Sequence, residues 1–401
     1  MFETHHMSRA HATASLEKFL PKSGRAYAHG RNTDHGPGQH YAVSCLSPFF
    51  RRRLITEDEA IKKTLSAQSF SQAEKYIQEI FWRTYFKGWM EMRPSVWHQF
   101  LGMRHVPDGH DTYQKAISGQ TGIACFDAWI EELRETGYLH NHARMWTASI
   151  WIFTLRLPWA WGADFFLTHL ADGDPASNTL GWRWVAGLHS RGKHYLARAD
   201  NIDSFTNGRF APYGQLNEQA VALEEMPPAA AAPLTLFEPT PKKPSMLVMT
   251  AEDCSPQTHD FGVPVVAAAS LPVAFGAGGQ NAAILALDAA AMTDGLSQCK
   301  AHFDVPIYDA IGGGADAQSA EASLPEGLLE LARSSGAEQC VMLAPPVGFW
   351  SDNLAKIKQA LSQAGLPLYL QRRTYDAICW PHAKRGFFPF KEKIPSFIRD
   401  F

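Results

Sequence analysis

Apolar side chains recur at helical spacing through the first half of the chain. Residues 76–86 place bulky apolar side chains three and four positions apart, which is typical of one face of a helix. Residues 126–136 form another such segment, and we expect Gly137 to end it as a C-cap. Residues 142–157 are apolar nearly all round, so a helix there would be buried on every side. Strand-like alternation is scarce, and this half predicts an all-helical domain.

Short apolar runs alternate with helix-like stretches in the second half. The runs cover residues 246–249, 263–266, 305–308, 340–343 and 366–370. The stretches between them cover residues 281–292, 324–334 and 353–364. This alternation predicts a Rossmann-like α/β domain, in which a parallel sheet carries helices on both faces.

The 401 residues fit two or three domains, and the two textures, with a terminal segment and a linker, divide the chain into four parts. Residues 1–24 are polar and His-rich and are expected to be flexible. Residues 25–224 form the helical domain, and the Pro- and Ala-rich residues 225–244 form a linker. Residues 245–401 form the α/β domain with a C-terminal tail that packs back onto the body.

Composition narrows the partners of the chain. The 37 Lys and Arg against 40 Asp and Glu give a net charge of −3, so nucleic acid would have to meet a local basic patch. Residues 51–53 with 62–63, or Arg183, Arg191 and Lys193, could form one, or could be a solvated face. The six Cys include no closely spaced pair, which argues against a zinc or iron–sulfur site, and no metal is expected. We expect a cytoplasmic monomer without membrane contact.

The most informative polar residues lie between Gly137 and Trp184. Asn141, Arg144 and Met145 share one predicted helix, and residues 172–178 (DGDPASN) form a polar loop. A bound heterocycle needs a few aimed polar groups within an apolar shell, which this loop and the Trp residues after it would supply. An Asx-rich turn between two core helices would give the same pattern, and the residues alone leave both interpretations open.

The chain resembles the DNA photolyase/cryptochrome family in several ordered segments between Tyr27 and Phe210. The segment 170–184 (LADGDPASNTLGWRW) is similar to the flavin loop of that family, and 136–145 (TGYLHNHARM) to the helix before it. Further matches are 78–83 (QEIFWR), 121–127 (TGIACFD), and Tyr27 with 30–32 (GRN) and 43–48 (VSCLSP). The resemblance implies an all-helical FAD-binding domain of photolyase/cryptochrome type.

The resemblance also implies which residues bind FAD. Ser44 and Ser47 would hold the phosphates with help from Tyr27. Arg83 and Arg144 would bracket the flavin and favour its anionic reduced form. Asp172 and Asp174 would bind polar edges of flavin and ribose, and Asn178 would face the flavin N5. The full implied set is Tyr27, Ser44, Leu46, Ser47, Glu79, Arg83, Asn141, Arg144, Asp172, Asp174 and Asn178.

A second set of residues matches the part of the family that handles damaged DNA. The positions implied for the dimer pocket are Glu79, Trp82, Asn141, Met145 and Trp184. Trp182 and Trp159 match the inner and middle members of an electron relay. The third position falls near His105, where Trp89, Trp97 or Trp161 could substitute. Every one of these Trp residues could instead serve core packing.

The chain departs from the family in ways that bear on repair more than on FAD. Val43 replaces a Thr, Tyr138 a Trp and His142 an Arg, and residues 187–209 differ from the usual segment. The antenna-like α/β domain follows the helical domain instead of preceding it. Residues 359–369 and 384–393 resemble parts of that domain, which suggests swapped domain order. The Gly-rich residues 276–279 could approach a nucleotide or form a plain turn.

These resemblances imply a blue-light-driven deoxyribodipyrimidine photo-lyase. Such an enzyme splits cyclobutane pyrimidine dimers in UV-damaged DNA by electron transfer from reduced FAD. The alternative is a cryptochrome-like photoreceptor flavoprotein that binds FAD, repairs nothing and acts through a signalling partner. The sequence leaves open whether the protein is an enzyme and whether an antenna chromophore is bound.

Overall fold

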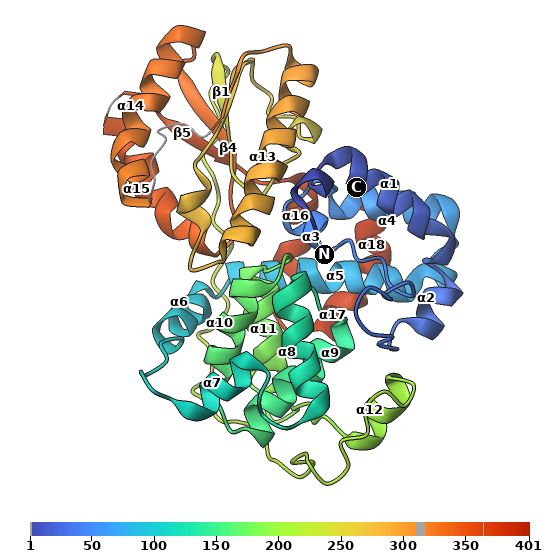
Figure 1. The fold of residues 1–401 in the computed structure, drawn as a ribbon. Helices are drawn as coiled ribbons and strands as arrows, with labels where there is room; N and C mark the ends of the chain where they lie inside the picture. Colours follow the sequence, from blue (N-terminus) through green and yellow to red (C-terminus); the bar gives the residue numbers. More distant parts are fainter. Residues whose placement is uncertain (1, 310–316, 364) are drawn as a thin grey trace.

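The first half of the chain is helical, as its apolar spacing predicted. The computed structural model describes residues 2–309, 317–363 and 365–401. The helices of this half are α1 (Arg9–Phe19), α2 (Arg25–Gly30), α3 (Ser47–Arg51), α4 (Glu57–Ala67), α5 (Phe70–Glu91), α6 (Pro94–Met103), α7 (Asp111–Ser118), α8 (Ala124–Thr136), α9 (Asn141–Ser149), α10 (Trp159–His169), α11 (Pro175–Val185) and α12 (Ala199–Phe205). A π-helical turn, Ile150–Thr154, continues α9. Figure 1 shows these helices surrounding the long α5, which forms the centre of the helical part.

The structure places a helix in the N-terminal segment, while the flexibility expected for residues 1–24 stays a prediction. Helix α1 begins after Ser8, whose side chain accepts a hydrogen bond from the backbone N–H of His11 at 3.2 Å. The helix buries Ala12, Leu16 and Phe19 in the core. These apolar positions are three and four residues apart, a pattern that the polar, His-rich surroundings concealed.

The second half forms a doubly wound α/β unit, as predicted. Its five strands are β1 (Ser245–Met249), β2 (Val265–Ser270), β3 (Ile307–Tyr308), β4 (Gln339–Leu343) and β5 (Leu368–Gln371). All pairings are parallel and the order is β3-β2-β1-β4-β5, the arrangement of a Rossmann-like sheet. Helix α13 (Ala282–Phe303) covers one face, and α14 (Ala317–Ser335) and α15 (Phe349–Gln363) cover the other (Figure 1).

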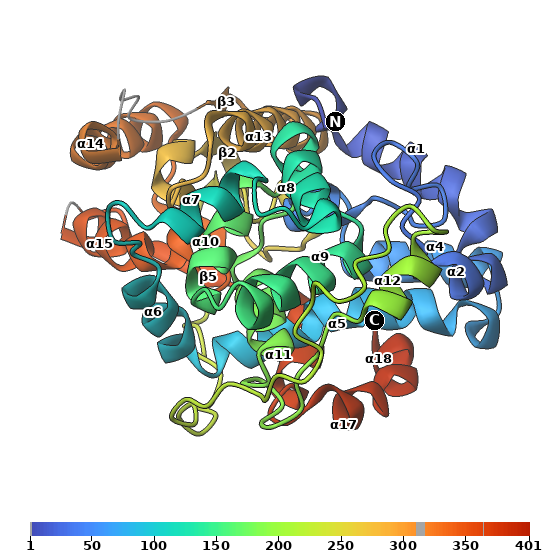
Figure 2. The same ribbon diagram turned by 60° about the horizontal axis from the view of Figure 1, so that its bottom comes forward.

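The C-terminal tail packs against the helical part of the chain. Its helices are α16 (Thr374–Cys379), α17 (Phe387–Lys391) and α18 (Ile394–Asp400). Figures 1 and 2 both show this segment beside α5. The Tyr375 and Thr84 hydroxyls hydrogen-bond at 2.8 Å, and Phe390 and Phe397 pack around Phe81. The tail therefore joins the helical core, while residues 225–244 contain no helix or strand and the domain boundaries stay a prediction.

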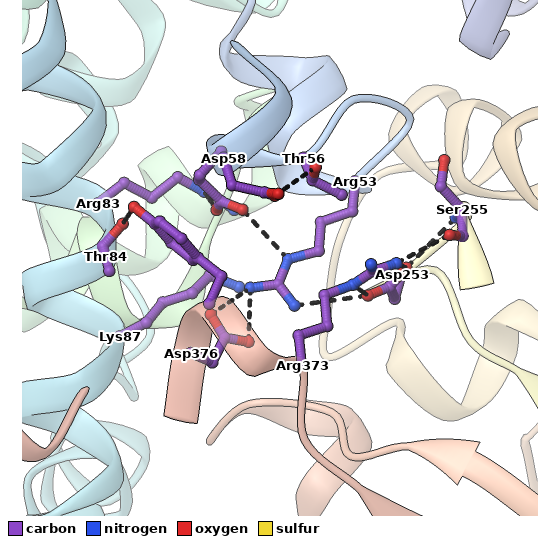
Figure 3. Close-up of polar contacts among 12 residues, drawn as sticks. Arg53, Thr56, Asp58, Arg83, Thr84, Lys87, Asp253, Ser255, Arg373 and Asp376 are labelled. Carbon is purple, nitrogen blue, oxygen red and sulfur yellow. Dashed lines mark hydrogen bonds and ion pairs between the residues drawn. The ribbon is translucent and has the colours of Figure 1, made fainter. Parts of the chain in front are cut away.

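A buried ionic cluster joins the carboxyl edge of the sheet to the helical part. Glu252 and Asp253 follow β1 at the switch point of the sheet, where open α/β folds often bind ligands. Here that crevice is filled by basic side chains of the chain itself. Arg51 contacts Glu252 at 2.8 Å, and Arg373 makes two bonds to Asp253 at 2.6 and 2.7 Å. Figure 3 shows Arg53 at the centre, facing Asp376 and Asp253.

Most of the predicted basic patch is therefore not available to nucleic acid. Arg51, Arg52 and Arg53 are buried and paired with carboxylates, Arg52 with Asp288 at 2.7 Å. Arg183 is buried as well and contacts Glu225 at 2.6 Å. An uninterrupted Arg triplet is typical of a surface, but here all of its acidic partners except Glu57 lie far away in the sequence.

The Gly-rich residues 276–279 serve close packing of side chains. A Cβ atom on Gly276 would lie 2.0 Å from the Trp350 indole nitrogen, and one on Gly278 would lie 2.1 Å from the Phe349 ring. Both aromatic residues stand at the start of α15. The glycines thus make room for this helix, which supports the plain-turn interpretation.

No helix in the described ranges is both long enough and apolar enough to cross a bilayer.

Candidate functional site

A cavity of about 610 Å³ opens in the helical part, a size suited to a cofactor. Helices α2, α3, α5, α9 and α11 and the loop before α11 contribute its walls. The predicted site residues that line it are Tyr27, Ser44, Ser47, Glu79, Trp82, Arg83, Asn141, Arg144, Met145, Asp172, Asp174, Asn178, Trp182 and Trp184. Leu46 and Trp159 are buried outside this lining. The structure thus gathers residues that lie more than 150 positions apart in the sequence.

Helical spacing explains why these side chains share one cavity. Three helices each turn one face toward it, with lining residues three and four positions apart. Those faces are Tyr76, Glu79, Ile80 and Arg83 on α5, Asn141, Arg144, Met145 and Ala148 on α9, and Ser177, Asn178, Gly181, Trp182 and Val185 on α11. On α9 and α11 the polar residues of the face lie nearer the N-terminal end of the helix. On α5 polar and apolar residues alternate along the face.

Asp172 offers an unused hydrogen-bond acceptor in the cavity wall. Its Oδ2 contacts Nη1 of Arg144 at 3.0 Å, and Arg144 Nε donates to the Leu139 carbonyl at 2.9 Å. The other carboxylate oxygen, Oδ1, is buried and has no hydrogen-bond partner. An unsatisfied buried acceptor costs about 1–3 kcal/mol, so the site favours a ligand that brings an N–H or O–H group.

Ser177 is a second buried polar group without a partner, and sequence reasoning missed it. Its Oγ is buried and unpaired although the residue lines the cavity. The signal was present, because Ser177 stands between Asp174 and Asn178 in the polar loop. A hydroxyl at this place can both donate to and accept from a ligand.

Asp174 is held by cations, which distinguishes it from Asp172. Its carboxylate lies 3.1 Å from both Arg83 Nη2 and Lys87 Nζ and caps α11 by accepting from Ser177 N–H at 2.7 Å. Burial alone would raise the pKa of Asp174, but Lys87, Arg83 and Arg51 lower that pKa far below its usual range. Asp174 therefore stays ionised and fixes Arg83 at the cavity edge. Lys87 was missed, although it follows Arg83 by one helical turn.

Asn178 lines the cavity, and its amide oxygen is available to a ligand. Its Nδ2 donates to the Ala163 carbonyl at 2.7 Å, and a carbonyl can only accept, so this contact fixes the orientation of the amide. The free Oδ1 is then an acceptor for a ligand N–H.

Another part of the cavity lining combines hydroxyls with one ion pair. Ser44 and Ser47 line it together with Tyr27. Burial raises the pKa of the Tyr27 phenol well above its usual value, so this hydroxyl remains protonated. Arg31, which the sequence placed in a family-like motif without assigning it a role, forms an ion pair with Glu79. Burial raises the pKa of the Glu79 carboxyl, and Arg31 only partly opposes this effect.

The aromatic wall depends on two other segments of the chain. The Trp82 ring stacks on Phe387 of α17 at 3.6 Å between centroids, with 12° between their planes. Trp184 stacks on Tyr195 at 5.9 Å. The unusual residues 187–209 thus return to cover Trp184, and the C-terminal tail supports Trp82.

His142 is neutral and fully engaged. Its Nδ1 lies 2.9 Å from the Asn32 carbonyl and must donate, so Nε2 accepts from the Tyr195 hydroxyl at 3.2 Å. Burial lowers the pKa of His142, in keeping with this neutral form. A neutral ring does not replace the charge of the Arg that the family resemblance leads one to expect.

The two predicted relay residues have different surroundings. Trp182 lines the cavity and meets Trp151 edge-on, with 6.0 Å between the ring centroids. Trp159 is 2% exposed, and its indole N–H donates to Glu225 at 2.7 Å. Its ring faces Phe100 at 5.9 Å. The proposed relay role of Trp159 stays a prediction.

The comparisons agree on one domain type. The family model described as the FAD binding domain of DNA photolyase matches residues 76–219. The deoxyribodipyrimidine photo-lyase of Vibrio cholerae is 26% identical over 192 residues, covering 46% of this chain and 40% of that protein. A deoxyribodipyrimidine photo-lyase of Thermus thermophilus is 33% identical over 183 residues, covering 44% of this chain and 42% of that protein. The chain therefore spans less than half the length of these relatives.

Two solved structures are similar over half of this chain and 43% of theirs. One is a bacterial class III photolyase from Agrobacterium tumefaciens, with 24% identity and a TM-score of 0.42. The other is the cryptochrome of Synechocystis sp. PCC6803, with 23% identity and a TM-score of 0.44.

Proposed function

We propose that the protein, whose residues 76–219 belong to the FAD-binding domains of the photolyase and cryptochrome family, is a blue-light-driven DNA photolyase acting on cyclobutane pyrimidine dimers. FAD is the cofactor of that domain, as the sequence predicted. The observation that carries the proposal is the cavity itself, where unsatisfied polar atoms meet an aromatic wall.

The polar wall fits FAD in chemistry as well as in size. Bound FAD would supply light absorption and one-electron transfer. Oδ1 of Asp172 and Oδ1 of Asn178 are free acceptors for flavin or ribose donors. Arg83 and Arg144 place positive charge at the cavity, which favours an anionic reduced ring. Ser44, Ser47 and Ser177 offer hydroxyls to the phosphates or ribose.

The aromatic wall would hold the damaged bases. Trp82, Met145 and Trp184 line the cavity and would pack against a flipped-out dimer. Glu79 lines the same wall as a partner of Arg31, and its carboxylate would accept a hydrogen bond from a base N–H. Asn141 stands on the same face of α9 as Met145 and would bond a base or the flavin.

An exposed basic surface lies beside this wall. Lys384 and Arg385 are exposed just before Phe387, which stacks on Trp82, and Phe388 is 77% exposed. Exposed Arg191 and Lys193 belong to the same area, because the Tyr85 hydroxyl binds both the Arg385 carbonyl and His189. These side chains supply the local basic patch that the buried Arg triplet cannot, and they suit DNA phosphates.

Two features favour the second candidate, a cryptochrome-like photoreceptor without repair activity. His142 is neutral where a cation is expected. Tyr195 contacts both His142 and Trp184 and covers them. Both changes lie on the side that would face a lesion and leave the polar wall unaffected. The receptor would share the FAD site and repair nothing.

The decisive experiment uses the full chain reconstituted with FAD and chemically reduced. It is mixed with oligonucleotides containing one thymine dimer, single- or double-stranded, and illuminated with blue light. Light-dependent restoration of the intact thymines supports the photolyase. Stoichiometric FAD without repair of either substrate would leave the receptor, and absence of FAD would overturn both.

The DNA surface has its own test. The double variant Lys384→Glu, Arg385→Glu should bind dimer-containing DNA more weakly. The salt dependence of its affinity should be flatter by the equivalent of about two phosphate contacts. Lys300→Glu with Lys358→Glu is the control of equal charge, because both residues are exposed on the α/β part. Equal losses in the two variants would remove the assignment of this surface.

A further inference from the structure

A continuous row of aromatic rings leads from the cavity toward the surface. Trp182 meets Trp151 at 6.0 Å and 84°, Trp151 meets Tyr113 at 5.9 Å and 88°, and Tyr113 meets Trp161 at 5.9 Å and 85°. Trp151 is fully buried, whereas Tyr113 and Trp161 are only partly covered. The first ring lines the flavin cavity and the last one reaches solvent.

The contact between the first two rings depends on one glycine. A Cβ atom on Gly162 would lie 2.2 Å from the Trp182 ring and 2.9 Å from the Trp151 ring. Any other residue at this helical position would push the rings apart. Gly162 directly follows Trp161 on α10, so one turn of helix shapes the inner and the outer part of the row.

We propose that this row is the electron-transfer path of the protein, with Trp151 as the middle relay and Trp161 as the solvent-facing end. The proposal rests on the proposed FAD function. In this path Trp151 and Trp161 supply electrons to the light-excited flavin through Trp182. They take the place of Trp159 and of the third Trp that the resemblance leads one to expect.

The electrons and protons balance along the path. One electron leaves the Trp182 indole for the flavin, and Trp151 returns one electron to Trp182. Trp161 then returns one electron to Trp151 across the ring of Tyr113, and the oxidised Trp161 releases its indole N–H proton to water. A soluble thiol finally restores one electron and one proton to Trp161.

Polar contacts along the row suit these separate roles. The Trp151 indole N–H donates to the Pro158 carbonyl at 3.0 Å, and an amide carbonyl is too weak a base to remove that proton. Trp151 therefore passes the oxidation on. At the outer end, Asp164 lies close to Tyr113 and forms an ion pair with Arg104 at 3.2 Å. Burial first and the Asp164 carboxylate second raise the pKa of Tyr113, which keeps its phenol protonated.

In the described part of the chain, the ring that follows Trp159 is a phenylalanine and not a further indole. Trp159 is buried, and the ring it faces is Phe100, which is far harder to oxidise than an indole. The Arg183 guanidinium stands 5.3 Å from the Trp159 ring and opposes a positive charge there. Glu225, which is 25% exposed, pairs with Arg183 and accepts the Trp159 N–H, so it offsets part of this effect.

The test compares flavin photoreduction in matched Trp→Phe variants of the full chain loaded with oxidised FAD. Trp151→Phe and Trp161→Phe should each lower the yield of long-lived tryptophan radical about tenfold or more. Trp129→Phe is the control, because Trp129 is also buried with a bonded indole N–H, at 3.1 Å from Asp34, but lies outside the row. FAD content is measured for each variant, so loss of cofactor is separated from loss of the path.

Two further measurements report on the chain itself. Pulsed electron paramagnetic resonance should find a shorter distance between the flavin and tryptophan spins in Trp161→Phe than in the unaltered protein. Peptide mass spectrometry after illumination in air should find added oxygen at Trp161. Unchanged radical yield in Trp151→Phe, or loss only in Trp159→Phe, would overturn the path while leaving the FAD function intact; absence of FAD from the unaltered protein would overturn both.

Discussion

Replacing Arg53 by Met should unfold the junction between the sheet and the helical part. The Arg53 side chain is 6% exposed, and its Nη2 contacts both oxygens of Asp376 at 2.8 Å. It also lies 3.4 Å from carboxylates of Glu57 and Asp253. Met fills a similar volume but leaves the buried Asp376 carboxylate without its main partner. Removing one partner of a buried pair costs about 3–5 kcal/mol, and we expect a loss of that size.

The free energy of unfolding is measured by urea denaturation followed through tryptophan fluorescence. Lys63→Met is the control, since Lys63 and Glu17 form an exposed pair worth about 0–1 kcal/mol. In Arg53→Met the loss should shrink on acidification. Burial already raises the pKa of Asp376, and removal of Arg53 raises it further. A carboxyl with a raised folded-state pKa favours folding below its unfolded value of about 3.9 and loses that contribution as the pH rises.

The outcome for the double variant distinguishes a junction held by charge pairing from one held by packing. Arg53→Met with Asp376→Asn should be more stable than Arg53→Met alone, because no buried charge is stranded. A loss below about 1 kcal/mol in Arg53→Met, equal to that of the control, would refute this account.

Three further predictions concern the cavity and the helices around it. Asp172→Ala should weaken FAD binding about 10- to 100-fold in a fluorescence titration, because it removes the unsatisfied acceptor and the partner of Arg144; unchanged affinity would contradict this role. His140 caps α9 through an unprotonated Nδ1, and burial lowers its pKa to about 4, so the stability that this neutral ring provides should be present above pH 6.5 and vanish toward pH 4, whereas His140→Asn should flatten this part of the stability profile. Gly162→Ala should cost about 1–3 kcal/mol in thermal unfolding through overpacking, even though Ala favours a helix by about 1 kcal/mol; a stabilised variant would refute the tight contact of Trp182 and Trp151.

Local patterns predicted much of the fold because each element here has a short-range cause. The face of α5 and the five strands follow from apolar periodicity, and each predicted apolar run of the second half contains or overlaps a strand. The cavity residues were found because they stand at helical spacing within short motifs. The resemblance then assigned them a common ligand, which spacing alone left open.

The remaining features depend on partners distant in the sequence. Arg53 is buried because Asp253 and Asp376 reach it from more than 190 residues away, and no pattern around it announces them. The sequence could not distinguish Trp151 from the other buried Trp residues. Its proposed relay role depends on the close contact with Trp182 that Gly162 allows, and this contact is visible only in the folded structure. The helix at residues 9–19 was hidden by the polar composition around three apolar positions.

The two walls of the cavity have different supports, and this bears on repair. Ion pairs between residues of the helical part hold the polar wall together: Arg144 pairs with Asp172, and Asp174 pairs with Lys87. The aromatic wall relies on Phe387, which comes from beyond residues 76–219 and reaches Trp82 only when the C-terminal tail is docked. Disturbing the tail should therefore weaken the lesion-facing side before it weakens FAD binding. The proposed DNA site therefore depends on the C-terminal tail, whereas the proposed FAD contacts depend mainly on residues of the first half.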